Sequence, residues 1–596
     1  MLKKQSKTEQ KSNSVRGIGP TVIRIWSYLA EQRSLLILVL IMVVASSALG
    51  LMGPFLIGWG IDEYFATEST DGFIWLLAGL GVVYGLHSLS LWLQSYWMIG
   101  IAQKTVYTMR KQLFTHFHKL SIDFFNKRQH GELMSRVTND IENVSATLNS
   151  SVIQIFSSVL TLVGTLAVMI WLSPLLTLVT MIIVPLMFMG MKWITSRTGR
   201  LYKEQQRRLG EMNGYIEETI SGQKIIKSFS QEPKVIEEFR IKNKQLKESG
   251  YWAQTFTGFI PKLMNMLNNL SFTIVAAVGG YFALKGYVSI GTIVIFTEYS
   301  RQFTRPLNDL SNQFNTLLSA VAGADRVFDI IDTEEEAVDE KEAASLQNIK
   351  GKVEFKDVSF SYEKGGDTVS DLNFKAEPGE SIALVGPTGA GKSTIINLIS
   401  RFYEPNEGLI LIDGYDSKKI TRESLRTQMG FVLQDSFLFQ GSIRENIRYG
   451  RLDATDKEVE QAAKAANAHS FIRRLPERYD TVLSQDDAGI SQGQKQLLSI
   501  ARAILADPSI LILDEATSSI DTITELKIQE ALQHLLKGRT SFIIAHRLNT
   551  IKSADQIIVI EDGQIIEKGS HDELLVQKGF YHSLYTSQLE KKMLMN

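Results

Sequence analysis

Long runs without a charged side chain dominate the first half of the sequence. Residues 34–61 contain no Asp, Glu, Lys or Arg, and neither do residues 72–103. An α-helix rises about 1.5 Å per residue, so about 20 residues cross the roughly 30 Å hydrocarbon layer of a bilayer. Each run is long enough to predict a membrane-spanning helix.

Four more spans are predicted. The uncharged run 143–191 is too long for one crossing and is broken at Ser173-Pro174, which predicts a hairpin of two helices. Residues 263–284 give a fifth span. A sixth, interrupted by Glu298, is expected by parity, because the second half carries a phosphate-binding pattern and needs cytoplasmic nucleotide. The expected spans are about 34–61, 72–100, 148–172, 174–194, 258–284 and 286–310.

The distribution of charge predicts the topology. Residues 62–71 carry four acidic residues and no Lys or Arg, whereas 103–142 and 192–248 are rich in Lys and Arg. Cytoplasmic loops collect positive charge, so the N-terminus and both basic loops are expected in the cytoplasm. The first apolar run is longer than a signal-peptide core, so we expect no cleavage. The chain has no cysteine, which excludes disulfides and thiolate metal sites.

The basic loops and an acidic segment set the expected domain boundaries. The loops are too long for structureless connections and show helical periodicity, so the membrane helices are expected to continue into the cytoplasm. Residues 331–351 are acidic, polar and poor in aromatic residues, as is typical of a linker. We expect a transmembrane domain at 1–330, a linker at 331–350 and a nucleotide-binding domain at 351–596.

A phosphate-binding pattern lies in the second half. The stretch SIALVGPTGAGKSTIINLI reads as an apolar strand, a glycine-rich turn and a helix, the context in which G-x-x-x-x-G-K-[ST] is convincing. Backbone amides of the turn would surround phosphate oxygens, Lys392 would reach the β- and γ-phosphates, and Ser393 would ligate Mg²⁺. The alternative is a glycine turn without a ligand. The residues expected around ATP here are Gly386, Gly389, Ala390, Gly391, Lys392, Ser393 and Thr394.

Two further strands supply acids and a histidine. The strand SILILDEAT ends in neighbouring acids, which the alternation of side chains points to opposite faces. Asp514 would therefore hold Mg²⁺ through its water shell, and Glu515 would orient or deprotonate the attacking water. His546, at the end of SFIIAHRL, would sense the γ-phosphate. The alternatives are structural acids and a structural histidine.

These motifs together resemble the ATP-binding cassette exporters, in the half-transporter form with six membrane spans and one nucleotide-binding domain. The resemblance extends from about residue 20 to the end of the chain. It implies a membrane protein: an all-α six-span transmembrane domain, with helices extending into the cytoplasm, fused to an α/β P-loop nucleotide-binding domain. It also implies an ATP hydrolase coupled to transport, with Glu515 and His546 as catalytic residues.

The resemblance implies roles for further residues. Tyr362 is similar to the aromatic residue that stacks on adenine, although a strand aromatic is the alternative. Gln434 is similar to the loop glutamine that touches Mg²⁺, which makes the implied metal set Ser393, Gln434 and Asp514. Asp521 resembles the acid of the loop that crosses to the partner's ATP site. Segments 120–127 and 220–229 resemble the two coupling helices, which dock on nucleotide-binding domains, the second on the partner's.

The stretch GISQGQ departs from the family's signature, Leu-Ser-Gly-Gly-Gln, which binds the γ-phosphate of ATP held by the opposite subunit. Ser491, Gly493 and Gln494 match the signature, whereas Gln492 replaces its first glycine and Ile490 its leucine. Glutamine puts a side chain where backbone approach was free, so we expect altered closure on the partner's nucleotide.

The altered signature predicts a heterodimer. This chain's own nucleotide motifs look intact, so its ATP would meet a standard signature from a partner and be hydrolysed. Gln492 would face a degenerate partner site that binds ATP and turns over slowly. The SQGQ sequence is similar to the hydrolysis-competent half of heterodimeric bacterial multidrug exporters. The alternative is a working homodimer that tolerates glutamine.

The expected substrate is a lipophilic compound, exported across a bacterial plasma membrane with both termini in the cytoplasm. Glu298 lies near the middle of the sixth span, where an ionisable group suggests function, here attraction of a lipophilic cation. An i,i+3 ion pair with Arg301 is the structural alternative. A homodimeric lipid or peptide exporter would share every motif, and a regulatory or channel-like ATPase would keep ATP binding. The five strong spans exclude a soluble nucleic-acid ATPase.

Overall fold

The structure is a computed structural model that describes residues 18–65, 71–363, 366, 368–434, 436–483, 489–514, 520–545 and 548–595. The described residues form two compact units. The first unit comprises those up to residue 118 together with 129–333. The second comprises residues 119–128 together with those from 334 onward. The chain therefore contributes to the second unit twice, first as a short segment and then as a domain.

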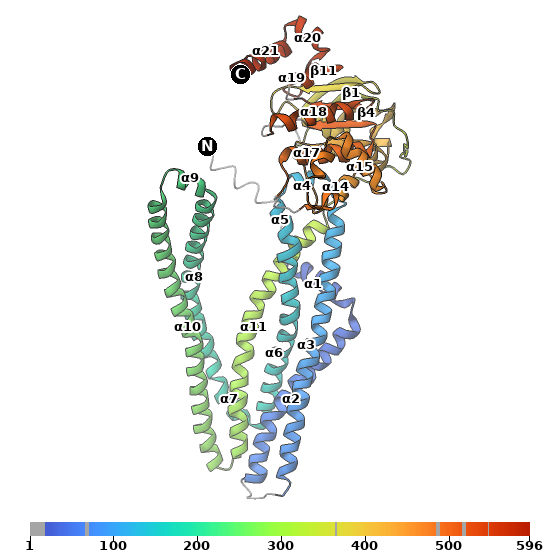
Figure 1. Ribbon diagram of the computed structural model, residues 1–596. Coiled ribbons are helices and arrows are strands. Elements are labelled where there is room, and N and C mark those ends of the chain that lie inside the picture. Colours follow the sequence, from blue (N-terminus) through green and yellow to red (C-terminus); the bar gives the residue numbers. More distant parts are fainter. Residues whose placement is uncertain are drawn as a thin grey trace. The chain divides into compact units, whose positions relative to one another are not determined.

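The first unit is built of helices (Figure 1). The membrane-length helices and their neighbours are α1 (Ile18–Ala30), α2 (Arg33–Gly60), α3 (Phe73–Phe117), α5 (His130–Ser135), α6 (Ile141–Leu172), α7 (Pro174–Met181), α8 (Ile183–Ser221), α9 (Gln223–Ser228), α10 (Glu232–Leu284) and α11 (Ile290–Ile331). Short π-helical turns, Ile61–Phe65 and Arg136–Asp140, continue α2 and precede α6. A helix satisfies its own backbone hydrogen bonds, which is what a chain in lipid requires.

Large apolar side chains point outward along these helices. Ile37, Ile41 and Val44 of α2 are exposed, as are Trp75 and Val82 of α3. Such continuous apolar surfaces suit contact with lipid. Four stretches among the described residues are long and apolar enough to cross a membrane: Arg33–Phe65, Phe73–Phe117, His130–Leu172 and Glu232–Leu284.

The fourth and sixth expected spans differ from these four. The expected hairpin break lies where α6 ends at Leu172 and α7 begins at Pro174, with the Ser173 hydroxyl accepting a hydrogen bond from the Leu176 amide at 3.4 Å. The span expected at 174–194 falls on α7 and the start of α8. The span expected at 286–310 falls on α11, whose polar residues lower its hydropathy. The six-span count therefore stays a prediction.

The helices of the first unit form two sets of close neighbours, and α10 also packs against α11 (Figure 1). Helices α2, α3, α6 and α11 pack together, and α8 runs beside α10 with α9 between them. Helices α2 and α11 approach closely: a Cβ built at Gly291 would lie 2.0 Å from the Gly58 carbonyl oxygen. The Asp62 carboxylate accepts a hydrogen bond from the Gly291 amide at 2.7 Å and so caps the first turn of α11.

Three sheets form the frame of the second unit. A four-stranded antiparallel sheet has the order β2-β1-β4-β5, and a six-stranded sheet has the order β12-β11-β3-β10-β9-β6. In the larger sheet only the pairing of β12 is antiparallel. The strands are β1 (Val353–Phe360), β2 (Val369–Ala376), β3 (Ser381–Val385), β4 (Glu407–Ile412), β5 (Tyr415–Asp416), β6 (Met429–Val432), β7 (Gly441–Ser442), β8 (Val482–Leu483), β9 (Ile510–Asp514), β10 (Thr540–Ile544), β11 (Gln556–Glu561) and β12 (Gln564–Gly569).

Helices alternate with these strands, as parallel pairing requires. They are α4 (Ile122–Asn126), α12 (Lys392–Ile399), α13 (Arg422–Thr427), α14 (Ile443–Arg448), α15 (Asp456–Ala465), α16 (His469–Ile472), α17 (Gln492–Ala506), α18 (Thr522–Leu536), α19 (Leu548–Lys552), α20 (His571–Gln577) and α21 (Phe580–Met595). Helix α4, from the short segment 119–128, belongs to this unit although it lies far earlier in the sequence.

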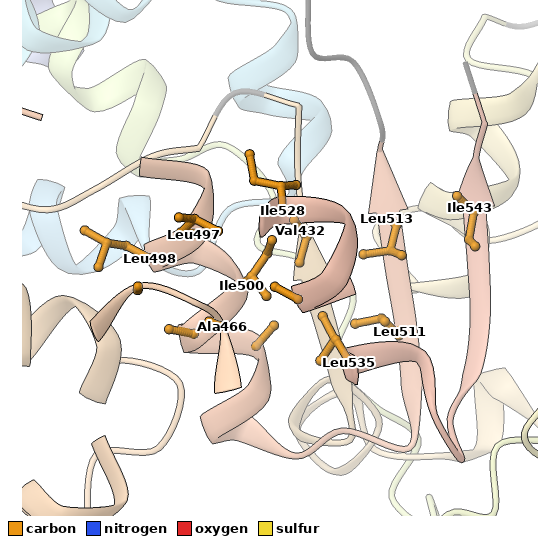
Figure 2. Close-up of a cluster of buried hydrophobic side chains, with 14 of the residues drawn as sticks. Val432, Ala466, Leu497, Leu498, Ile500, Leu511, Leu513, Ile528, Leu535 and Ile543 are labelled. Carbon is orange, nitrogen blue, oxygen red and sulfur yellow. The ribbon is translucent and has the colours of Figure 1, made fainter. Parts of the chain in front are cut away.

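The parallel strands are buried on both faces. Along β9, Leu511 and Leu513 belong to one hydrophobic core, whereas Ile510 and Ile512 belong to the other. This is the two-residue period of a strand between two apolar layers. Figure 2 shows the first core, in which Leu511 and Leu513 meet α17 and α18 side chains. That core fixes the signature helix against the strand that carries Asp514.

The segment expected as a linker is held against the second unit. Helix α11 ends at Ile331, and β1 begins at Val353. Between them Glu336 pairs with Arg426 at 2.6 Å, and Asp339 pairs with Arg422 at 2.7 Å. The acidic composition that indicates a solvated linker here supplies partners for arginines of the domain.

The core in Figure 2 generates a stability prediction. Leu535 is fully buried on α18, so Leu535→Ala should lower the free energy of unfolding of the second unit by about 2–5 kcal/mol through lost burial and a residual cavity. The measurement is the thermal unfolding midpoint of the purified chain. Leu452→Ala, at a side chain that is 78% exposed, is the matched control and should change the midpoint little. Equal shifts for both variants would contradict the assignment of Leu535 to the core.

Candidate functional site

The candidate site lies where parallel strands end. Strands β3, β10 and β9 are neighbours in the sheet, and β6 follows β9. Their carboxyl ends share one edge, and this edge is where open α/β sheets place ligands. The glycine-rich loop follows β3, Asp514 ends β9, and Gln434 follows β6 by two residues. Strand β10 ends at Ile544, two residues before His546 in the sequence.

At two positions of the loop the backbone lies so close to neighbouring atoms that only glycine fits. A Cβ built at Gly386 would lie 2.1 Å from the Ile560 carbonyl oxygen, so only glycine lets the loop pass strand β11. Gly391 has φ 105° and is the N-cap of α12, and its Cβ would lie 2.6 Å from Val369 Cγ1. The loop therefore turns sharply into the N-terminus of α12, where free amides and the helix dipole favour an anion. Ala390 is buried beside it, and Gly389 has open space around it.

The Lys392 ammonium group closes the loop. Its Nζ donates to the carbonyl oxygens of Gly386 and Pro387 at 2.8 Å and 2.7 Å. The side chain is buried, and this burial lowers the pKa of Lys392, although the nearby charge of Asp514 acts in the opposite direction. A phosphate in the loop would add negative charge beside the buried ammonium group.

The first turn of α12 presents two hydroxyl groups in different surroundings. Ser393 is exposed, so its hydroxyl can reach a ligand, whereas Thr394 is buried. The Thr394 hydroxyl accepts a hydrogen bond from the Tyr362 hydroxyl at 3.3 Å. Asn397, one turn later, donates to the Tyr362 hydroxyl at 3.1 Å. Tyr362 is thus fixed to the phosphate-loop helix, and its contact with adenine stays a prediction.

The remaining oxygen donors come from two strand ends. Gln434 is exposed and Asp514 is partly buried at the end of β9. With Ser393 they are a hydroxyl, an amide and a carboxylate, and oxygen donors of this kind suit Mg²⁺. The predicted catalytic residues Glu515 and His546 lie outside the described residues. Their roles stay predictions from the sequence.

The signature residues form the N-terminus of α17. Ser491 is the N-cap, and its hydroxyl oxygen accepts a hydrogen bond from the Gln494 amide at 3.3 Å. The Gln494 side-chain oxygen accepts in return from the Ser491 amide at 2.9 Å. This capping box leaves the Ser491 hydroxyl hydrogen able to donate to an incoming phosphate.

The two central signature residues differ in their surroundings. Gly493 is buried, and a Cβ there would lie 2.5 Å from Thr524 Cγ2 of α18, so this glycine is fixed by packing within the chain. Gln492 is exposed at the first position of α17. Because its side chain is exposed, the glutamine changes the surface that the N-terminus of α17 presents.

Asp521 also serves as a helix cap. Its carboxylate accepts a hydrogen bond from the Thr524 amide at 2.9 Å and so begins α18. Hydrogen bonding from the Thr524 backbone lowers the pKa of Asp521, which keeps the exposed carboxylate charged. A cap role and a contact with a second subunit are compatible, because the carboxylate has more than one acceptor position.

The two expected coupling segments form separate helices. Segment 120–127 contains α4, which lies in the second unit and contacts Tyr403 through Asn126. Segment 220–229 contains α9 in the first unit, where Ile220, Ile225 and Phe229 are exposed. Tyr403 and Asn397 could not be predicted as part of this region, because an aromatic residue in RFYEP and an amide one turn into a helix are common in sequences.

The proposed substrate residue Glu298 has a partner on its own helix. Arg301 Nη1 lies 3.5 Å from Glu298 Oε1, and both side chains are about half exposed. The Arg301 guanidinium also lies 5.6 Å from the centre of the Phe272 ring on α10. The i,i+3 ion pair is therefore present, and any attraction of a cation by Glu298 competes with Arg301.

Comparisons with known proteins agree with this arrangement. The model of the ABC transporter transmembrane region matches residues 36–307, and the ABC transporter model matches residues 369–518. An uncharacterized ABC transporter ATP-binding protein of Bacillus subtilis, YfiC, is 64% identical over 589 residues, covering 99% of this chain and 97% of that protein.

A more distant relative and a solved structure extend the comparison. A fatty acid ABC transporter ATP-binding/permease protein of Mycobacterium bovis is 40% identical over 602 residues, covering 94% of this chain and 95% of that protein. The structure of a bacterial Atm1-family ABC exporter with ATP bound aligns with a TM-score of 0.74 and 29% identity, covering 93% of this chain and 98% of that chain.

The geometry of Lys392 yields a prediction. Lys392→Met fills the buried space but supplies neither the charge nor the two hydrogen bonds to the loop, so ATP hydrolysis should fall by about a hundredfold or more. The measurement is phosphate release by the purified transporter in lipid. Lys464→Met, at an exposed position of α15, is the matched control. Undiminished hydrolysis by Lys392→Met would show that the loop does not hold the hydrolysed nucleotide.

Proposed function

We propose that this chain exports lipophilic compounds as one half of a heterodimer. The chain belongs to the ABC transporter family and is an exporter whose ATP hydrolysis is coupled to transport. The family match covers both a transmembrane region and an ATP-binding domain. The finer statements are the proposal: a multidrug type of substrate range, a different partner chain with a degenerate ATP site, and a place in the bacterial plasma membrane with both termini in the cytoplasm. The orientation rests on the basic loops and the acidic segment 62–71.

Residues of this chain bind and orient the nucleotide. The amides of the Gly386–Gly391 turn and the N-terminus of α12 hold the phosphates, and Lys392 neutralises the β- and γ-phosphates. Tyr362 stacks on the adenine ring. Glu515 orients or deprotonates the attacking water, and His546 contacts the γ-phosphate. Ser393, Gln434 and Asp514 would hold Mg²⁺, which supplies charge neutralisation on the phosphates when bound.

The proposal of a heterodimer rests on one observation: Gln492 is exposed at the start of α17, whereas Gly493 is packed against α18. The substitution leaves this chain's own fold intact and alters only the surface offered to another subunit's nucleotide. An added side chain at a helix N-terminus reduces the backbone approach available to phosphate. The site formed by this chain's loop and a standard signature would then hydrolyse ATP, and the other site would turn over slowly.

The transport step follows from differential binding. ATP links two nucleotide-binding domains only when they are closed, so its binding favours the closed dimer and, through α4 and α9, an outward-open membrane domain. Hydrolysis removes the γ-phosphate contacts and lets the domains separate. The exposed apolar side chains of α9 would be covered by the partner's nucleotide-binding domain.

A second substrate class is favoured by a relative. The protein of Mycobacterium bovis, 40% identical, is named a fatty acid ABC transporter, which favours a lipid as the exported compound. A fatty acid carries a negative charge, whereas a cationic drug carries a positive one. Transport of a labelled fatty acid and of a cationic dye by the same vesicles distinguishes the two classes.

The heterodimer is tested by ATPase activity in lipid. The chain purified alone should hydrolyse ATP slowly, and co-expression with a candidate partner, such as the product of a neighbouring gene, should give substrate-stimulated activity. Glu515→Gln in this chain should abolish most activity of the mixed complex while preserving ATP binding. Full stimulated activity from the chain alone would show a homodimer that tolerates glutamine in its signature.

The role of Glu298 is tested by Glu298→Gln. If the carboxylate attracts a cation, export of a cationic dye should fall about threefold to tenfold, because about 1 kcal/mol of lost attraction is worth somewhat less than tenfold in affinity. Export of a neutral lipophilic dye is the control and should not change. Unchanged export of the cationic dye would leave Glu298 with only its ion pair to Arg301.

A further inference from the structure

An aromatic cluster lies between the nucleotide loop and helix α4. The rings of Phe360, Tyr362 and Tyr403 meet edge to face, with the Tyr362 and Tyr403 centroids 4.9 Å apart at an interplanar angle of 90°. Edge-to-face contacts depend on orientation, so a shift of one ring moves the favourable position of the next. All three residues belong to the second unit.

The hydroxyl groups of the two tyrosines point to different elements. The Tyr362 hydroxyl bonds to Thr394 and Asn397 of α12, the helix that begins at the phosphate loop. The Tyr403 hydroxyl donates to the Asp123 carboxylate at 3.4 Å and accepts from Asn126 Nδ2 at 3.2 Å, both on α4. Burial raises the pKa of Tyr403, so the phenol keeps the hydrogen that it donates. One tyrosine is thus fixed to the nucleotide side and the other to α4.

The segment after α11 fixes the base of α4. The Glu336 amide donates to the Lys119 carbonyl oxygen at 2.7 Å, just before α4, and the Lys119 ammonium pairs with Glu335 at 3.0 Å. Glu336 is itself paired with Arg426 at 2.6 Å. Residues 119–128 are therefore fixed at their start by backbone and ionic contacts. The residues that bond to the Tyr403 hydroxyl, Asp123 and Asn126, follow this fixed start of the segment.

The contact region is not tightly filled. An open groove of about 300 Å³ is lined by Asp123 of α4, by Ser121 and Lys127 at its two ends, and by Tyr362 and Tyr403. The two rings border open space on this side, so they have room to shift together. A change at Tyr362 can therefore reach α4 through Tyr403 without displacing a packed core.

We infer that Tyr403 is a positioning residue that conveys nucleotide occupancy from Tyr362 to α4. The inference rests on the proposed place of Tyr362 against the adenine ring. Adenine stacked on Tyr362 would restrict the position of the Tyr362 ring, and this ring sets the edge-to-face contact with Tyr403. The Tyr403 hydroxyl in turn holds Asp123 and Asn126 by hydrogen bonds. This route starts at the base of the nucleotide, whereas Gln434 would report from its phosphates, and it lies within a single chain.

The test is amide hydrogen exchange of residues 119–128 in the full-length transporter in lipid nanodiscs, with and without a non-hydrolysable ATP analogue. The wild-type chain should show slower exchange in this segment when the analogue is bound. Tyr403→Phe keeps the ring and its contact with Tyr362 but removes the hydroxyl. It should bind the analogue as tightly as wild type yet lose about threefold or more of the nucleotide-dependent protection, as expected when a hydrogen bond is lost.

Two further variants complete the design. Asn126→Ala changes the other side of the same contact and should reproduce the loss without altering the nucleotide-binding domain. Tyr415→Phe removes a hydroxyl from an exposed tyrosine of the same unit and should retain the wild-type protection. The KM for ATP should stay constant in Tyr403→Phe while the substrate-stimulated kcat falls, a split that a general loss of folding would not produce.

The outcomes separate this inference from the proposed function. Wild-type protection in both Tyr403→Phe and Asn126→Ala would overturn the inference. A wild-type chain that hydrolyses ATP and exports substrate but shows no nucleotide-dependent change at 119–128 would also overturn the inference and leave the exporter intact. A wild-type complex that exports neither dye nor fatty acid would contradict the proposed substrate classes, and the exchange result would still decide the role of Tyr403.

Discussion

The burial of the parallel strands on both faces is the constraint on which the nucleotide site depends. Strand β9 sends Leu511 and Leu513 into one core and Ile510 and Ile512 into the other, so a slip by one residue would exchange the two sets and disrupt the packing of both cores. Its neighbours β3 and β10 are held in the same way. The ends of these strands are therefore fixed, and with them the start of the phosphate loop and Asp514.

The same core extends this constraint to the signature helix. Leu497, Leu498 and Ile500 of α17 belong to the same core as Leu511 and Leu513 of β9 (Figure 2). The N-terminus of α17 is held by its capping box, and Gly493 is held against α18. A rigid domain thus presents two chemically different surfaces: a complete phosphate loop for its own nucleotide, and a signature with an added glutamine for another subunit. This difference is the physical basis of the proposed asymmetry.

The sequence predicted the parts of this architecture that are encoded locally. The apolar runs of α2, α3, α6 and α10, the break at Ser173-Pro174, and the strand, turn and helix around Lys392 are set by neighbouring residues. Helical periodicity in the basic loops predicted that the membrane helices continue beyond their apolar parts, as α10 does from Glu232, but not the residue at which each helix begins. The Tyr403 contact with Asn126 joins residues 277 positions apart, and the ion pairs of Glu336 and Asp339 form only after folding. No local pattern could have predicted these contacts. The predicted catalytic roles of Glu515 and His546 rest on the sequence alone.

The proposed asymmetry requires that the ATP bound by this chain's own loop is the ATP that is hydrolysed. The most direct measurement is photoaffinity labelling with a radioactive azido-ATP in the mixed complex, after orthovanadate has trapped the hydrolysis product. The trapped label should lie on this chain and be absent from the partner, because only this chain's nucleotide meets a standard signature. Equal label on both chains, or label on the partner alone, would contradict it.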